Sequence, residues 1–224
     1  MTEIAIAYDV RTLEEALALD QRLGAGPEIA KVGLELFTAA GPEAVRALRD
    51  RGRRVFLDLK LHDIPNTVRG AAAAAARLGA ELLTVHAMGG GEMLRAAVEG
   101  VGEGGGTGVI AVTVLTSMNQ AGLKEVGVVI DVMDQVLRLA ELTKEAGLDG
   151  VVASPRETAA IRKRCGDGFQ IVTPGIRAAN APKDDQQRTM SPAEALAAGA
   201  SYLVVGRPII AAPDPLAAAR QIGE

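Results

Sequence analysis

The chain has 224 residues, 48% of them hydrophobic, and a formal net charge of −4. This size suits one large domain with a sizeable core, and the mild acidic balance excludes a broad nucleic-acid or anionic-membrane surface. A single cysteine, Cys165, excludes an internal disulfide and a multi-cysteine metal site. The N-terminal segment lacks a signal-peptide pattern, and no apolar run is long enough to span a bilayer. We therefore expect a cytoplasmic protein with no membrane or nucleic-acid partner.

Short segments rich in Val and Ile alternate with helical segments along the chain. The expected strands are residues 4–8, 30–34, 54–60, 82–87, 108–115, 150–154, 170–175 and 202–207. The expected helices, several of which open with a capping box or a proline, are residues 12–24, 41–52, 66–79, 131–147, 154–166 and 191–199. Two glycine-rich segments, residues 88–92 and 103–108, are expected to form loops before a helix and before a strand, respectively.

Alternating βα units predict a parallel sheet, and eight of them favour closure into a single (β/α)8 TIM barrel spanning residues 1–224. The alternative is an open doubly wound sheet, which would need a glycine-rich dinucleotide loop after the first strand. Asp9-Val10-Arg11-Thr12 stands there instead. No linker-like change in composition divides the chain.

The segment FLDLKLHDIPNT, residues 56–67, begins like a buried strand but carries charges of both signs. Because side chains alternate across a strand, Asp58 and Lys60 should point into the barrel while the leucines between them pack on the helices. Lys31 on the neighbouring strand extends this to an array of ammonium and carboxylate groups. The carboxylates favour the charged form of Lys60 and so make it a positioned proton donor. For the Asp58–Lys60 pair alone, a structural salt bridge is the alternative.

Active sites of barrels lie at the carboxyl ends of the strands, where Asp9, Asp63 and Thr116 are also expected. Of the two histidines, His86 is the better candidate for a site role, and His62 is expected in a supporting or surface position. Two histidines and scattered carboxylates give no convincing transition-metal site.

A phosphate site is expected from the loops after the seventh and eighth strands. They supply Gly175, Arg177, Gly206 and Arg207, whose backbone amides and guanidinium groups suit an anion. Residues 173–192 form a long polar segment between them, which we interpret as a lid over a phosphorylated substrate. An exposed disordered loop is the alternative.

The segment DLKLHDIPNT, residues 58–67, resembles the signature of the orotidine 5′-phosphate decarboxylase family. Tyr8 is a departure, because the family usually has Leu at this packing position. The resemblance covers almost the whole chain, since six further blocks agree in order: IAYDV (6–10), KVGLELF (31–37), VTVLTS (112–117), VTPGIR (172–177), DDQQR (184–188) and VVGRPI (204–209).

The resemblance implies a carboxy-lyase that converts orotidine 5′-monophosphate (OMP) to UMP and carbon dioxide, the final step of de novo pyrimidine biosynthesis, with no metal or organic cofactor. Lys60 would protonate C6 of the pyrimidine, with Asp58 beside the substrate carboxylate and Lys31 and Asp63 completing the array. The family also implies a homodimer with shared sites, in which Asp63, Ile64 and Thr67 cross the interface. The remaining substrate contacts implied are Asp9 and Lys31 at the ribose, Thr116 at the base, Gln186 from the lid, and Arg177, Gly206 and Arg207 at the phosphate.

Two alternatives stay open. Sugar-phosphate decarboxylases and hexulose-phosphate synthases resemble this family and share its Asp-x-Lys-x-x-Asp core, but they use magnesium to stabilise an enediolate. The HDIPNT continuation and the DDQ segment favour the pyrimidine enzyme. A non-catalytic nucleotide-binding barrel is the second alternative, although binding alone would not need Lys60 between carboxylates.

Overall fold

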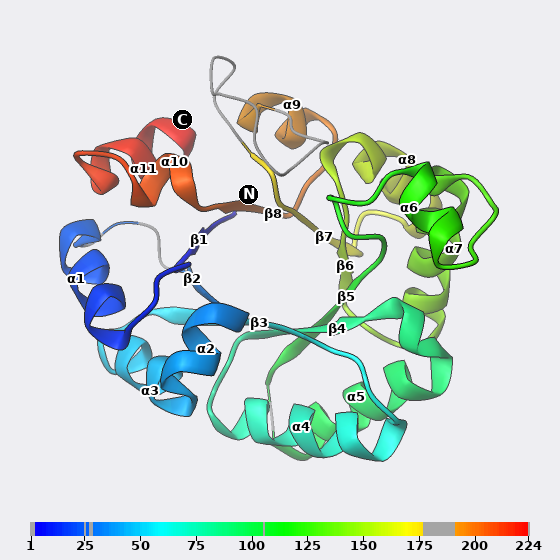
Figure 1. Cartoon of the computed structure of the whole chain (residues 1–224), viewed down its shortest axis with the longest axis horizontal. Coiled ribbons are helices and arrows are strands. Elements are labelled where there is room, and N and C mark those ends of the chain that lie inside the picture. The colour runs from blue at the N-terminus through cyan, green and yellow to red at the C-terminus, as the bar shows by residue number, and fades with distance from the viewer. Residues whose placement is uncertain (1–2, 25, 27–28, 105, 177–190, 224) are drawn as a thin grey trace.

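The computed structural model describes residues 3–24, 26, 29–104, 106–176 and 191–223. Its strands are all parallel and close into a barrel in the order β1 to β8, with β8 paired to β1 (Figure 1). The closed (β/α)8 barrel is thus confirmed, and the open sheet is wrong. The strands are β1 (Glu3–Ala7), β2 (Ile29–Gly33), β3 (Arg54–Leu61), β4 (Leu82–His86), β5 (Gly108–Val112), β6 (Gly150–Val152), β7 (Gln170–Thr173) and β8 (Tyr202–Val205).

Helices form a ring outside the strands (Figure 1). Each of the six predicted helices is present, and its ends lie within two residues of the prediction. The helices are α1 (Leu13–Leu23), α2 (Leu34–Ala40), α3 (Pro42–Asp50), α4 (Pro65–Arg77), the 3₁₀ helix η1 (Ala87–Gly89), α5 (Gly90–Gly104), α6 (Gln120–Glu125), α7 (Val132–Glu145), α8 (Pro155–Cys165), α9 (Pro192–Ala197), α10 (Arg207–Ile210) and α11 (Pro215–Gly223).

Several predicted boundaries are wrong. The second strand ends one residue early because Leu34 already begins α2, and the fifth strand ends at Val112. The glycine-rich segment 88–92 is not a loop, because η1 runs through residue 89 and α5 begins at Gly90. Glycine is a poor helix former, but Met93 and Leu94 in the next turn are buried. Tertiary packing therefore outweighs local propensity there.

Two apolar layers hold the barrel. Between the strands and the helices lies the larger, aliphatic layer, and a smaller cluster fills the barrel interior. At the amino-terminal ends of the strands, Arg54 of β3 forms ion pairs with Glu3 of β1 and Glu81, which precedes β4. The interior is therefore filled toward one end, and the carboxyl ends of the strands are left for a site. The interior cluster consists of Ala5, Ile29, Phe56, Leu82, Ile110, Val172 and Tyr202.

Tyr8, the departure from the family pattern, is buried at the end of β1 as a packing residue would be. Its hydroxyl also donates a hydrogen bond of 3.0 Å to Oδ1 of buried Asp20 in α1. Arg53 Nε donates to the same oxygen at 2.6 Å. Burial, followed by the charge of Asp20, raises the pKa of Tyr8 far above its ordinary value. The tyrosine therefore stays neutral and ties β1 to α1 directly beside Asp9.

Candidate active site

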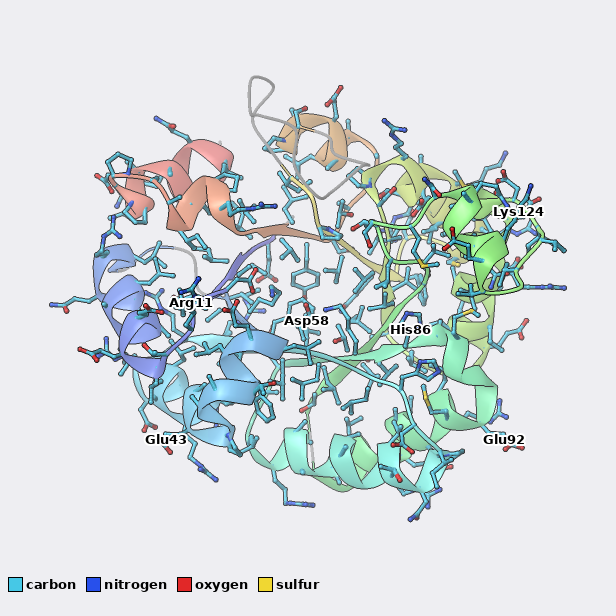
Figure 2. The ribbon with its side chains drawn as sticks, in the orientation of Figure 1. Arg11, Glu43, Asp58, His86, Glu92 and Lys124 are labelled. Carbon is cyan, nitrogen blue, oxygen red and sulfur yellow. The ribbon has the colours of Figure 1, made fainter. Side chains whose placement is uncertain are left out.

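A cavity of about 440 Å³ lies at the carboxyl ends of the strands. Figure 2 shows Asp58 directed toward the centre of the ring of strands, whereas Glu43, Glu92 and Lys124 lie at its periphery. The polar lining comes from two groups of strands, which adjoin where β8 pairs with β1. The first group, β1 to β3, supplies Asp9, Lys31, Asp58 and Lys60, and the ends of β5, β7 and β8 supply Thr116, Gly175, Gly206 and Arg207.

The four charged side chains form a continuous array. Lys31 Nζ lies 3.0 Å from Asp9 Oδ1 and 3.6 Å from Asp58 Oδ2. Lys60 Nζ lies 2.8 Å from Asp58 Oδ1. The side chains of Lys31 and Asp58 are 9% and 14% exposed, against 31% for Lys60 and 51% for Asp9. The predicted alternation of carboxylate and ammonium is confirmed for these residues, and its least solvated part is the Lys31–Asp58 pair.

Asp58 is held as an anion. Burial alone would raise the pKa of its carboxyl, but the charges of Lys31 and Lys60 act in the opposite direction. Hydrogen bonds from Lys60 and Thr84 act with them, so the pKa falls below its ordinary value of 3.8. Asp58 is therefore ionised at neutral pH and presents a fixed negative charge to the cavity.

The backbone at Lys60 is irregular. Leu57 pairs with Leu83, and Leu61 pairs with Val85, so residues 58–60 stand opposite the single residue Thr84 of β4. Lys60 has φ = 52°, the only positive φ at a non-glycine among the described residues. The predicted alternation is nevertheless confirmed, because Asp58 and Lys60 line the cavity while Leu57, Leu59 and Leu61 pack in the outer apolar layer. Within the bulge, Lys60 Nζ lies 2.8 Å from Asp58 Oδ1, the pairing that the alternation predicted.

Thr84 is a site residue that the sequence analysis missed. Its side chain is fully buried, its Oγ1 accepts a 2.9 Å hydrogen bond from Lys60 N, and it donates one of 2.9 Å to Asp58 Oδ1. A threonine within a β-rich segment such as LLTVHA is ordinary, so composition gave no signal. Its position opposite the DLK segment would have been the only indication.

The three residues expected at a dimer interface lie away from the array. Asp63, Ile64 and Thr67 are exposed, with Ile64 at 67%. Asp63 Oδ1 accepts a 2.6 Å hydrogen bond from Ile64 N. Within the described residues of one chain, none of the three lines the cavity or joins the ion pairs of the array. Their role across an interface stays a prediction.

The same cavity also has the features expected of an anion site. Gly206 and Arg207, where β8 passes into α10, line the cavity, as do Thr116 after β5 and Gly175 after β7. Gly175 has φ = 79°, a conformation that favours glycine. Arg177 and Gln186, and residues 177–190 of the predicted lid, lie outside the described residues.

The two histidines form a pair beside the site. The rings of His62 and His86 stack with their centroids 5.2 Å apart and an interplanar angle of 17°. Burial, then the charges of His62 and Lys60, lower the pKa of His86, and its Nδ1 accepts from Met88 N at 3.4 Å. Neither ring lines the cavity. The expectation that His86 serves the site directly therefore has no support in its position.

Across the part of the chain that the structure describes, no group of three or more His, Cys, Asp or Glu side chains is arranged to hold a metal ion. Asp58 directs both carboxylate oxygens at ammonium groups. No described helix combines the length and apolar character needed to cross a membrane.

A family model described as "Orotidine 5'-phosphate decarboxylase / HUMPS family" matches residues 2–222. The chain belongs to this family. A relative from Moorella thermoacetica named orotidine 5'-phosphate decarboxylase is 57% identical, with 98% of this chain and 90% of that protein covered. A relative of the same name from Alkalilimnicola ehrlichii is 55% identical, with coverages of 97% and 93%. The crystal structure of orotidine 5'-phosphate decarboxylase from Lactobacillus acidophilus aligns with a TM-score of 0.89 at 38% identity, covering 100% of this chain and 98% of the other.

Proposed function

We propose that this protein is a carboxy-lyase that decarboxylates OMP to UMP and carbon dioxide in pyrimidine biosynthesis. The observation that carries the proposal is the array of Asp9, Lys31, Asp58 and Lys60 in the wall of a cavity of about 440 Å³. Relatives named for this activity, at 50–57% identity over nearly the whole chain, support it. The size of the cavity suits one small-molecule ligand.

The chemistry needs a fixed cation at one carbon atom. When the bond from C6 of the pyrimidine to the carboxylate breaks, the electron pair stays on C6 in the plane of the ring, where no π system delocalises it. An ammonium already in place stabilises this charge without reorganisation. Lys60 Nζ then transfers a proton to C6, carbon dioxide leaves, and UMP remains. Asp58, 2.8 Å from that nitrogen, orients the Lys60 ammonium and lies beside the departing carboxylate.

The rest of the nucleotide fixes C6 in position. Asp9 and Lys31 bind the ribose hydroxyls, Thr116 contacts the base, and Gly206 and Arg207 hold the phosphate; all five residues line the cavity. Because the phosphate does not react, its binding energy serves to position the ring. The predicted contacts from Arg177 and Gln186 stay predictions, as does the cytoplasmic location.

We further propose a homodimer in which Asp63, with Ile64 and Thr67, completes the array of the partner subunit. The exposed Asp63 and the 67% exposed Ile64, next to β3, support this arrangement. A mixing experiment tests it: Lys60→Ala and Asp63→Asn subunits, each inactive alone, should regain activity in hybrid dimers. Random mixing gives one intact site per hybrid, or roughly a quarter of all sites. No recovery from hybrids of demonstrated composition would place Asp63 outside the shared site.

The central test follows the loss of OMP absorbance with purified protein in excess EDTA. The parent should turn over rapidly, and Lys60→Ala should lower kcat by roughly 10³-fold or more, since it removes both the proton donor and the fixed charge. Lys124→Ala is the matched control, because Lys124 is exposed in α6 at the periphery (Figure 2). No OMP turnover together with no UMP binding would favour a magnesium-dependent sugar-phosphate lyase. UMP binding without turnover would indicate a binding module.

A further inference from the structure

The left-handed backbone at Lys60 needs a cause outside the residue itself. Lysine has a Cβ atom that disfavours φ = 52°, so local propensity opposes this conformation. The β3–β4 register breaks at the same place, and Lys60 N therefore has no regular ladder partner on β4. Such strained positions persist only where the surroundings determine them.

Thr84 supplies the missing partner through its side chain. Its Oγ1 accepts from Lys60 N at 2.9 Å and donates to Asp58 Oδ1 at 2.9 Å. Since an ionised carboxylate has no proton, the hydroxyl hydrogen must point to Asp58, which leaves an oxygen lone pair for Lys60 N. One fully buried hydroxyl thus joins the backbone of the proposed proton donor to the carboxylate that orients its ammonium.

We propose that Thr84 is a positioning residue for the decarboxylation, which holds Lys60 in its left-handed conformation and aligns Asp58 with the Lys60 ammonium. This inference rests on the proposed function. Thr84 does not line the cavity, so it acts through Lys60 and Asp58 and not by touching substrate. A hydroxyl makes both bonds where a methyl group of the same size makes neither, and the branched Cβ of threonine restricts its rotamers.

Three variants separate positioning from a structural role. Thr84→Val keeps the shape but removes both hydrogen bonds, whereas Thr84→Ser keeps the hydroxyl. Thr113→Val is the matched control, because Thr113 is equally buried and, among the described residues, its hydroxyl donates to Val152 O, 3.0 Å away, and not to a group of the array. If the valine variant does not fold, Thr84→Ala removes the same hydrogen bonds without placing a methyl group where the hydroxyl was.

Steady-state kinetics on OMP should show kcat lowered about 10- to 100-fold in Thr84→Val, the range for losing a hydrogen bond to a charged group. KM should stay within about 3-fold, because Thr84 touches no substrate. Thr84→Ser should recover most of the loss, and Thr113→Val should keep the parent kcat. The acid limb of the kcat profile should move to higher pH in Thr84→Val, since a hydrogen bond that lowers the pKa of Asp58 is gone.

A folded Thr84→Val enzyme with the parent kcat and pH profile would overturn the inference. A fall in kcat of the same size in Thr113→Val would also overturn it. A crystal structure of Thr84→Val that retains φ near 52° at Lys60 would overturn it independently of activity. Failure of the proposed function gives a different result, because the parent itself would then not turn over OMP.

Discussion

Replacing Asp58 by asparagine tests whether the array is held together by charge. The change keeps the shape of the side chain and removes one negative charge that faces two ammonium groups. Asp58 Oδ1 is 2.8 Å from Lys60 Nζ, and Oδ2 is 3.6 Å from Lys31 Nζ. In the variant, two cations surround a neutral amide at the least solvated part of the array.

The expected loss of stability follows from burial. Removing one partner of a buried ion pair costs about 3–5 kcal/mol because the other charge stays buried. The Lys60 side chain is 31% exposed, so solvent moderates the effect and the lower end, about 3 kcal/mol, applies. For a chain of this size that corresponds to a fall in Tm of roughly 6–12 °C.

The loss of stability in Asp58→Asn should be largest at neutral pH and smaller in acid. Because the folded state lowers the pKa of Asp58 below 3.8, the unfolded chain takes up this proton first on acidification. The stability contributed by Asp58 is therefore complete well above pH 3.8 and is lost as the pH falls through the lower folded-state pKa. The difference in unfolding free energy between the parent and Asp58→Asn should therefore become smaller in that acid range.

Urea unfolding followed by circular dichroism, at one fixed protein concentration, measures both effects. Asp9→Asn is the matched control, because Asp9 also pairs with Lys31 but its side chain is 51% exposed. It should cost no more than about 1 kcal/mol. Equal losses in the two variants, or an Asp58→Asn protein more stable than the parent at neutral pH, would refute the electrostatic reasoning.

Two further predictions concern residues outside the proposed chemistry. In Gly33→Ala, the added methyl would lie 2.9 Å from Lys31 Nζ and 3.3 Å from Asp9 Oδ1, so the ammonium must move. We expect kcat/KM to fall roughly 10-fold with little change in Tm. Gly70→Ala is the control, because a methyl group added at Gly70 meets nothing within 4 Å. Equal kcat/KM values in the two variants would contradict the reasoning. In Arg54→Met, loss of the ion pairs to its two glutamates should lower the unfolding free energy by about 1 kcal/mol, since all three side chains are roughly a third exposed. Its kcat should be unchanged because these groups lie at the amino-terminal ends of the strands, and a lower kcat in a folded variant would contradict this.

Much of the fold could be predicted because its signals are local and repeated. Eight runs of β-branched residues between capped helices predict a parallel barrel, and each predicted strand is present. The short helices α2, α6, α10 and α11 were not predicted. A helix of four to nine residues shows little periodicity, and the apolar start of α2 continues directly from β2, so the two cannot be separated by pattern alone.

Part of the array of Asp9, Lys31, Asp58 and Lys60 could also be predicted from local sequence signals. The two-residue spacing of Asp58 and Lys60 and the position of Lys31 on the next strand indicate groups at one end of a barrel. Asp63 has the same sequence signal but lies outside the array of its own chain, because β3 has ended and the chain turns into α4. Sequence proximity to a motif therefore does not by itself place a side chain in the site.

The bulge at Lys60 shows why the remaining part required the structure. A regular strand would leave Lys60 N in the β3–β4 ladder, and lysine by itself disfavours φ = 52°. The conformation is stabilised by Thr84, 24 residues further along the chain, through a hydroxyl that also bonds Asp58. No local pattern contains that relation, since it exists only once β3 and β4 lie side by side. The departure from regular structure and the orientation of the proposed proton donor thus have one cause, and strain is found where the chemistry requires a fixed position.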